Sequence, residues 1–224
     1  MSVNSRVHVV VPAAGLGLRM GASLPKQYLP LIDRPILQWT LETLTSLNPA
    51  NLMVAINAED KWFRELPEIG HIKPVLGGQT RAQSVLNALN ELDAPDDDWV
   101  LVHDAVRPCL RLESAQRLIE VALSDGMGAI LAQPVTETLK RADGQRIQAT
   151  VDRNNLWRAQ TPQIFPFAAL REALASNLEA TDEASAMEAL GHSVKLVPGD
   201  HDNIKITTKS DLDFAAFVLS QEHR

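Results

Sequence analysis

The stretch from Val9 to Lys26, V-V-V-P-A-A-G-L-G-L-R-M-G-A-S-L-P-K, decides the fold of this chain. The apolar, β-branched run 7–11 predicts a buried strand, and Pro12 ends its hydrogen bonding within a sheet. Four of the next five residues have little or no side chain, so their backbone amides can approach an anion closely. Arg19 and Lys26 place two cations beside those amides. The stretch therefore predicts a phosphate-binding loop at the end of a strand.

Two better-known phosphate loops do not match this stretch. The dinucleotide fingerprint G-x-G-x-x-G would need glycine where the chain has Met20, and no Gly-Lys-Ser/Thr of a Walker A loop follows. An alternative interpretation is a plain strand-to-helix turn, and short glycine patterns alone do not separate the two. Arg19 and Lys26 favour the phosphate interpretation, because an ordinary turn has no use for cations on both sides.

Composition limits the classes of function. The chain has 224 residues, 45% hydrophobic and 22% charged, as expected for one large globular domain or one domain with an appendage. Its net charge of -7 argues against binding to nucleic acid. The single cysteine, Cys109, excludes a disulfide framework and a thiolate zinc site. We expect no signal peptide and no membrane span, and hence a cytoplasmic enzyme or binding protein.

Beyond the opening stretch, segments with strand and helix spacing alternate. Helices are predicted over 35–47, 60–66, 81–92, 111–123, 167–177, 182–190 and 210–219, and further strands over 52–56, 72–76, 99–103, 128–132, 194–197 and 204–206. This alternation predicts an α/β fold with a mainly parallel, twisted sheet and helices on both faces. Ligands bind beyond the carboxyl ends of such strands, here at 12–26, 77–81 and 104–108.

Two helix starts carry capping signals. Thr80 is expected to cap the helix that begins at Arg81. Thr181 is expected to cap the helix 182–190, whose Glu183 and Glu188 are expected to face solvent.

The pattern changes between about 135 and 156. Segments 136–141 and 147–151 alternate apolar and polar residues around Ala142-Asp143-Gly144, and Asp-Gly between such segments predicts a β-hairpin. We expect this insertion to project as an arm from a single domain that spans residues 1–224. Two interpretations remain open: the arm pairs with a second subunit, or it is a simple edge hairpin.

Two aspartates are candidate metal ligands. Asp104 follows an apolar strand, and a carboxylate there, facing a triphosphate, is well placed to hold Mg²⁺. Asp202 is a candidate second ligand. The alternatives are that Asp104 caps a turn with Arg107 as its surface partner, and that Asp202 belongs to a charged turn.

A second anion pocket is a further hypothesis. Arg153, Arg158 and Lys205 are its candidate cations, and each taken alone also fits a solvated surface charge. No His–Asp pair or reactive cysteine stands out as a general base, and His103 is expected only to end a strand.

Several motifs occur in one order between 9 and 207: V-P-A-A-G-L-G-L-R-M, P-K-Q-Y-L, G-G-Q-T-R-A-Q-S-V, V-L-V-H-D-A-V-R-P, T-V-D-R-N-N-L-W, Q-T-P-Q, T-D-E-A-S-A and D-N-I-K-I-T. Together they resemble the 2-C-methyl-D-erythritol 4-phosphate cytidylyltransferases of the non-mevalonate isoprenoid pathway. The resemblance implies a Rossmann-like nucleotidyltransferase fold and a homodimer with interlocking arms. It also implies that CTP reacts with methylerythritol phosphate in the presence of Mg²⁺, releasing pyrophosphate.

The resemblance also implies roles for individual residues. The catalytic group would be Arg19, Lys26, Arg153 and Lys205, and the nucleotide would be bound by Pro12, Ala13, Ala14, Gly15, Gly78, Gln79, Ser84, Asp104 and Ala105. The sugar phosphate would be held by Arg107, Thr138, Arg153, Thr161 and Lys205, with the arm residues reaching across the dimer. Two positions depart from the pattern: Leu18 stands where some relatives have a second Arg, and Gln79 where some have Asp.

The chemistry agrees with this assignment. A phosphate oxygen, already ionised near neutral pH, is the attacking group, so no strong general base is required. Bringing two anions together calls for cations, Mg²⁺ and aligned amides, which supply charge neutralisation and positioning. Two other interpretations stay open: a cytidylyltransferase for another polyol phosphate, such as ribitol 5-phosphate, and a non-catalytic nucleotide-binding or regulatory protein.

Overall fold

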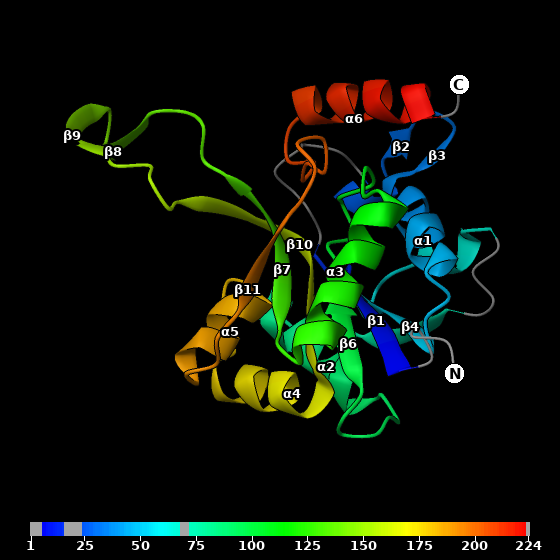
Figure 1. Ribbon diagram of the computed structural model, residues 1–224. Helices are drawn as coiled ribbons and strands as arrows, with labels where there is room; N and C mark the ends of the chain where they lie inside the picture. The colour runs from blue at the N-terminus through cyan, green and yellow to red at the C-terminus, as the bar shows by residue number, and fades with distance from the viewer. Residues whose placement is uncertain (1–5, 16–23, 68–71, 223–224) are drawn as a thin grey trace.

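The computed structural model describes residues 6–15, 24–67 and 72–222 (Figure 1). Its main sheet contains β1 (Val7–Pro12), β4 (Asn51–Ile56), β5 (Lys73–Leu76), β6 (Trp99–Val102), β7 (Ala129–Pro134), β10 (Trp157–Pro166) and β11 (Lys195–Pro198). The strand order is β11-β7-β10-β6-β1-β4-β5. Neighbouring strands run parallel except that β10 is antiparallel to both β6 and β7. The predicted mainly parallel sheet is therefore confirmed.

Helices cover both faces of this sheet (Figure 1). They are α1 (Ile36–Ser46), α2 (Arg81–Asn90), α3 (Leu112–Asp125), α4 (Phe167–Ser176), α5 (Glu183–Ala189) and α6 (Lys209–Glu222). Side chains of β1 alternate between the faces, so Val9 and Val11 pack with α1 and α3, whereas Val10 packs with α2 and α4. Each fully buried valine contributes about 1.5–3 kcal/mol through removal of apolar surface from water.

A smaller apolar cluster attaches α6 to the body. Leu31 of β2 (Pro30–Leu31) and Ile36 pack against Ala215 and Leu219 of α6. β2 pairs with the short β3 (Arg34–Pro35). Among the described residues, no helix combines the length and the apolar character that a membrane crossing requires.

The strand β10 was missed by the sequence prediction. Pro162 and Pro166 lie within it, and proline lacks the amide that a central strand donates. The pairing of β10 with β7 shifts register between Ala159 and Gln163, and this irregularity accommodates Pro162.

Three other local predictions were wrong. Residues 204–206 form no strand; Ile206 donates a single backbone hydrogen bond to Val106 and buries its side chain against α6. Residues 60–66 contain only a 3-10 turn, Phe63–Glu65. The helix α5 is capped by Asp182 rather than Thr181, because the Asp182 carboxylate accepts the Ser185 amide. The remaining predicted strands and helices occur within a few residues of their predicted bounds.

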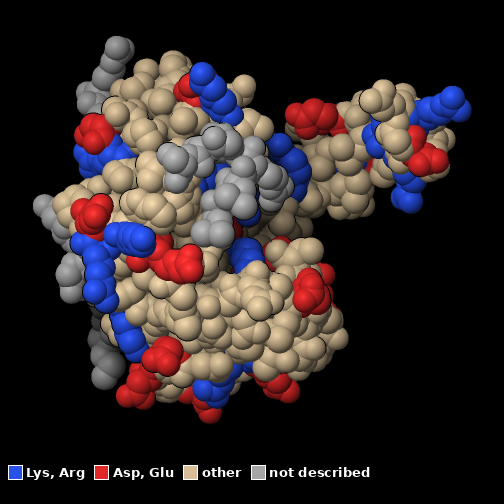
Figure 2. Space-filling model, turned by 180° about the vertical axis from the view of Figure 1, so that it is seen from behind, with Lys and Arg blue, Asp and Glu red and all other residues tan. Residues whose placement is uncertain are grey.

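The predicted hairpin arm is present. Its strands β8 (Leu139–Asp143) and β9 (Arg146–Val151) pair with each other and with no strand of the main sheet among those described. Figure 2 shows the arm standing clear of the body, with Lys and Arg side chains at its free end. Exposed apolar side chains also lie on the arm and at its base, at Leu139, Ile147, Leu156 and Trp157.

Candidate active site

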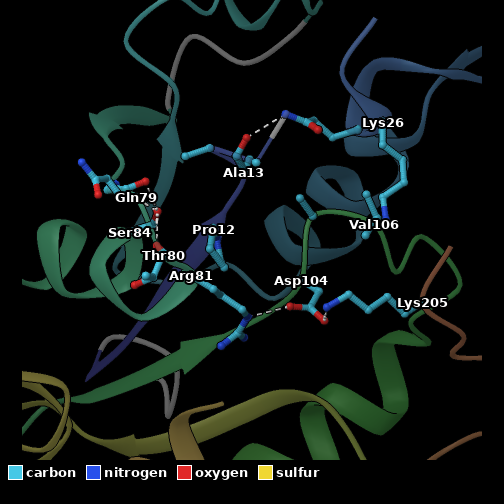
Figure 3. A pocket seen from close by; sticks show the side chains of 15 residues that line it. Pro12, Ala13, Lys26, Gln79, Thr80, Arg81, Ser84, Asp104, Val106 and Lys205 are labelled. Atoms are coloured by element: carbon cyan, nitrogen blue, oxygen red, sulfur yellow. Dashed lines mark hydrogen bonds and ion pairs between the residues drawn. The ribbon is translucent and has the colours of Figure 1, made fainter. Parts of the chain in front are cut away.

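A cavity of about 330 Å³ opens at the carboxyl ends of the central strands (Figure 3). Its walls come from four segments that are distant in sequence, 12–15, 26–27, 78–84 and 104–106, and from Lys205. It thus brings together every described residue expected to bind the nucleotide: Pro12, Ala13, Ala14, Gly15, Gly78, Gln79, Ser84, Asp104 and Ala105. Lys26 lines the same cavity, whereas Arg19 lies outside the described residues.

The small-residue loop is fixed by hydrogen bonds on both sides. The Ala13 amide donates to the Ala55 carbonyl over 2.7 Å, which extends the ladder of β1 past Pro12. The Ala13 carbonyl in turn accepts the buried Gln27 side-chain amide over 2.7 Å. Because Gln27 follows Lys26, this bond ties the lysine segment to the loop.

The second wall is the turn between β5 and α2. The Gly78 amide donates to the Ser84 hydroxyl over 3.0 Å, and that hydroxyl donates to the Thr80 carbonyl over 2.9 Å. A β-carbon on Gly77 would lie 2.4 Å from Ala14, so glycine is required where this turn meets the phosphate loop. The Thr80 hydroxyl accepts the Gln83 amide, which confirms the predicted cap and aims the helix N-terminus into the cavity.

Asp104 lies at the centre of a charge cluster. Its carboxylate contacts Arg81 Nε over 3.0 Å and Lys205 Nζ over 3.0 Å, on opposite sides in Figure 3, and Arg107 Nε over 3.3 Å. Burial alone would raise the pKa of Asp104, but these cations hold it well below its ordinary value. The carboxylate is therefore ionised at any working pH, as a metal ligand must be.

A second cavity of about 210 Å³ adjoins the first and shares Arg81, Asp104 and Lys205 with it. Of the residues predicted to hold the sugar phosphate, Arg107, Thr161 and Lys205 line this cavity. Thr138 and Arg153 are exposed on the arm and do not contribute to either cavity of their own chain. Arg158 is likewise exposed.

Neither histidine near the central strands offers a general base. Burial lowers the pKa of His103 to about 4, so its ring is neutral at pH 7 and hydrogen-bonds Thr161 and the Arg107 carbonyl. A His–Asp pair does exist, contrary to expectation: His8 Nε2 lies 2.9 Å from Asp98 Oδ2. It joins the start of β1 to the residue before β6, at the end of the sheet opposite the cavities.

The comparison with known proteins decides the family. A sequence profile described as IspD, 2-C-methyl-D-erythritol 4-phosphate cytidylyltransferase, matches residues 7–221. The chain belongs to this cytidylyltransferase family. The resemblance seen in the motifs is thereby confirmed, and the family is one of nucleotidyltransferases.

Relatives named for this cytidylyltransferase cover nearly the whole chain. The protein of that name from Shewanella amazonensis is 48% identical, covering 100% of this chain and 97% of the relative. The one from Actinobacillus pleuropneumoniae is 47% identical, covering 96% and 97%. The crystal structure of 4-diphosphocytidyl-2C-methyl-D-erythritol synthase matches with TM-score 0.85 and 38% identity, over 96% of this chain and 98% of that one. The Thermus thermophilus cytidylyltransferase structure gives TM-score 0.81 and 34% identity, over 96% and 99%.

Nucleotidyltransferases such as this cytidylyltransferase family generally use a divalent metal ion. Asp104 is the one carboxylate among the described residues that line the first cavity. Mg²⁺ is commonly bound through one or two carboxylates together with substrate phosphates, so this donor fits. The described residues contain no cluster of three or more His, Cys, Asp or Glu side chains able to hold a metal by themselves. Asp202 lines neither cavity, and its carboxylate pairs with Arg111.

Sequence reasoning missed Arg81, which lines the cavities, and the burial of its partner Glu183. Arg81 lines both cavities, and Glu183, expected to face solvent, is 0% exposed and pairs with Arg81. The sequence did offer a signal for Arg81. It is the first residue of a predicted helix and lies in the loop 77–81, one of the three loops expected to bind a ligand. Glu183 gave no such signal, because its partner is 102 positions away.

Proposed function

We propose that this chain transfers the cytidylyl group of CTP to 2-C-methyl-D-erythritol 4-phosphate. The products are 4-diphosphocytidyl-2-C-methyl-D-erythritol and pyrophosphate, and the reaction serves non-mevalonate isoprenoid precursor synthesis. One observation carries the proposal. A cavity with a small-residue loop and Lys26 adjoins a second cationic cavity, and the two share Asp104 and Lys205. Full-length relatives bear the name of this activity.

The first cavity is assigned to CTP. The loop 13–15 presents backbone amides to the triphosphate, and Lys26 adds a positive charge, with Arg19 assigned to the same task. The cytosine is assigned to the turn that carries Gly78, Gln79 and Ser84. Asp104 would hold Mg²⁺, which would neutralise part of the triphosphate charge.

The second cavity is assigned to the phosphate of methylerythritol phosphate, which Arg107, Thr161 and Lys205 hold. An oxygen of this phosphate attacks the α-phosphorus of CTP, the bond from that phosphorus to the β-bridging oxygen breaks, and pyrophosphate leaves. Lys26 stabilises the negative charge that develops around the α-phosphorus. No proton needs to be removed, which agrees with the neutral, fully hydrogen-bonded His103.

The proposal includes a homodimer. Thr138 and Arg153 are exposed on the arm. Apolar side chains of the arm are exposed as well, and Ile147 has the largest exposed fraction among them, 67%. Arms that interlock would bury these side chains and bring Arg153 and Thr138 to the second cavity of the partner. We also infer one domain for residues 1–224, because a single sheet takes strands from Val7 to Pro198.

A pyrophosphate-release assay tests the activity. CTP, UTP and ATP are each offered with methylerythritol phosphate and with ribitol 5-phosphate, in the presence of Mg²⁺. We expect release with CTP and methylerythritol phosphate, at least ten times faster than with any other pair. Faster release with ribitol 5-phosphate would assign the other polyol phosphate, and no release with any pair would favour a non-catalytic nucleotide-binding protein.

A further inference from the structure

Glu183 is a carboxylate with no access to solvent at the edge of the proposed site. It is the first residue of α5 and is 0% exposed. Its oxygens accept hydrogen bonds from the two terminal nitrogens of Arg81, over 2.7 and 3.0 Å. A buried carboxylate is costly unless it is paired, so this two-bond contact fixes the guanidinium plane of Arg81.

Arg81 connects Glu183 to the centre of the site. Its Nε contacts Asp104 Oδ1 over 3.0 Å. Arg107 and Lys205 both contact the other oxygen of that carboxylate, Oδ2. The fork of the two terminal nitrogens faces Glu183, and Arg81 meets Asp104 through its Nε–H on one carboxylate oxygen. Burial alone would lower the pKa of Arg81, but the two carboxylates raise it overall, so the side chain stays charged.

The other cations on Asp104 are held differently. Arg107 is anchored by a 2.7 Å hydrogen bond to the Asn203 carbonyl. The Lys205 side chain is 41% exposed, and Asp104 is its ion-pair partner. Displacement of Lys205 would give a divalent cation access to Oδ2 of Asp104, whereas Glu183 holds Arg81 on Oδ1.

We propose that Glu183 is a positioning residue that holds Arg81 on Oδ1 of Asp104, so that Arg81 does not also cover Oδ2, the oxygen that a divalent cation would reach by displacing Lys205. The inference rests on the proposed function, because it takes Asp104 as the metal ligand. Without the Glu183 charge, the partly buried guanidinium would turn its fork toward Asp104 and compete with the metal for that carboxylate. Losses of about 10- to 100-fold in metal affinity are typical when a group that orients a metal ligand is replaced.

The test measures Mn²⁺ binding to the protein with CTP and without sugar phosphate, by the loss of the free Mn²⁺ spin-resonance signal. We expect Glu183→Gln to raise the Mn²⁺ dissociation constant about 10-fold. Adding Arg81→Gln to that variant should restore Mn²⁺ affinity, because the competitor is then gone. A purely structural role for Glu183 predicts no such recovery.

The matched control is Asp98→Asn, which removes another buried carboxylate paired with Arg6 and His8, far from the cavities. We expect its Mn²⁺ affinity to equal that of the wild type. If Glu183→Gln does not fold, only the double variant is measured. A Mn²⁺ affinity of the double variant at or above that of the wild type then supports the proposal.

Three results would overturn the inference. They are unchanged Mn²⁺ affinity in folded Glu183→Gln, a double variant that binds as weakly as the single one, and a double variant weaker than the wild type where the single one does not fold. A wild-type protein that binds no Mn²⁺ with CTP would defeat the proposed function first and this inference with it. If the wild type binds Mn²⁺ with CTP and only the variants give a contradicting result, the inference about Glu183 is wrong and the proposed function is unaffected.

Discussion

Lys26 is held at the cavity by the two residues that follow it in the chain. Gln27 donates to the Ala13 carbonyl over 2.7 Å, and the Tyr28 hydroxyl donates to Asp60 over 2.7 Å. Asp60 in turn accepts the amides of residues 62 and 63. The lysine therefore projects from a segment whose next two residues are anchored by hydrogen bonds, which suits a cation that must be held in place to stabilise a transition state.

Lys26→Ala should reduce turnover without changing the fold. Removal of a fixed donor from such a site costs roughly 3–4 kcal/mol in the barrier, which corresponds to about 10²- to 10³-fold in kcat. Steady-state pyrophosphate release and thermal unfolding measure the two quantities. The control is Lys73→Ala, a half-exposed lysine near Glu91, for which we expect wild-type turnover. Near-normal turnover of Lys26→Ala would disprove the role assigned to the lysine.

Tyr28→Phe should weaken the support of Lys26. Burial raises the pKa of the Tyr28 phenol, so it is a neutral donor at all working pH values. Loss of its hydrogen bond to the Asp60 carboxylate should cost about 1.5–3 kcal/mol of unfolding free energy. We expect kcat to fall with little change in KM for CTP, because loop 13–15 is held by other bonds. Unchanged stability in urea titrations would contradict this account.

Short-range patterns predicted much of the fold, since most strands and helices follow hydrophobic periodicity. The strand β10 escaped because its two prolines argue against a strand, and only its neighbours β6 and β7 make the bulged conformation favourable. The candidate site shows the same contrast between features set by local sequence and features set by distant contacts. Loops after strands were predictable, whereas the burial of Glu183 depends on Arg81, which is distant in sequence.

The start of α6 carries a reciprocal cap that adjoins the Lys205 segment. The Thr208 hydroxyl accepts the Asp211 amide over 3.2 Å, and the Asp211 carboxylate accepts the Thr208 amide over 2.7 Å. Asp211 also accepts the amide and the hydroxyl of Thr207. These bonds fix the chain two residues after Lys205, so the cap influences the site as well as the helix.

Asp211→Ala should cost about 1 kcal/mol of unfolding free energy at pH 7, the usual value of a cap. The hydrogen bond from the Thr207 hydroxyl is the main cause that lowers the pKa of Asp211 to about 2, from an ordinary value of 3.8. Because the pKa of Asp211 is lower in the folded state than in the unfolded state, its ionised carboxylate stabilises the fold. This stabilisation is complete above about pH 4 and is lost as the pH falls toward 2. Denaturant unfolding should show that the difference in unfolding free energy between wild type and variant is smaller at pH 3 than at pH 7. A difference that stays constant or grows at pH 3 would refute the cap.

At the scale of the whole molecule, the exposed arm carries two residues assigned to the sugar phosphate that do not line the cavities of the body. The second cavity has its own cations, yet Arg153 and Thr138 lie outside it on a projection whose apolar side chains face solvent. A second copy of the chain is the partner that would bury the arm and use both residues.

Ile147→Asp should therefore shift the protein from dimer to monomer in sedimentation velocity and raise the KM for methylerythritol phosphate more than that for CTP. The isoleucine is 67% exposed, so the substitution leaves the folded subunit intact. Leu76→Asp is the control, at 62% exposure on β5, the edge strand opposite β11. A monomeric wild type, or equal dimerisation of both variants, would contradict the role of the arm.

Mixing two variants that each lack one cation of the proposed site tests whether Arg153 acts across the dimer. If each site uses Lys26 from one subunit and Arg153 from the other, a mixed dimer of Lys26→Ala and Arg153→Ala contains one intact site and one doubly impaired site. Random exchange from a 1:1 mixture makes about half of the dimers mixed, so activity should recover to about one quarter of the wild-type value. If Arg153 served its own chain, every site in the mixture would lack one cation, and activity would stay at the level of the separate variants. Co-refolding followed by the pyrophosphate assay distinguishes the two arrangements, because only exchange across the interface can create an intact site.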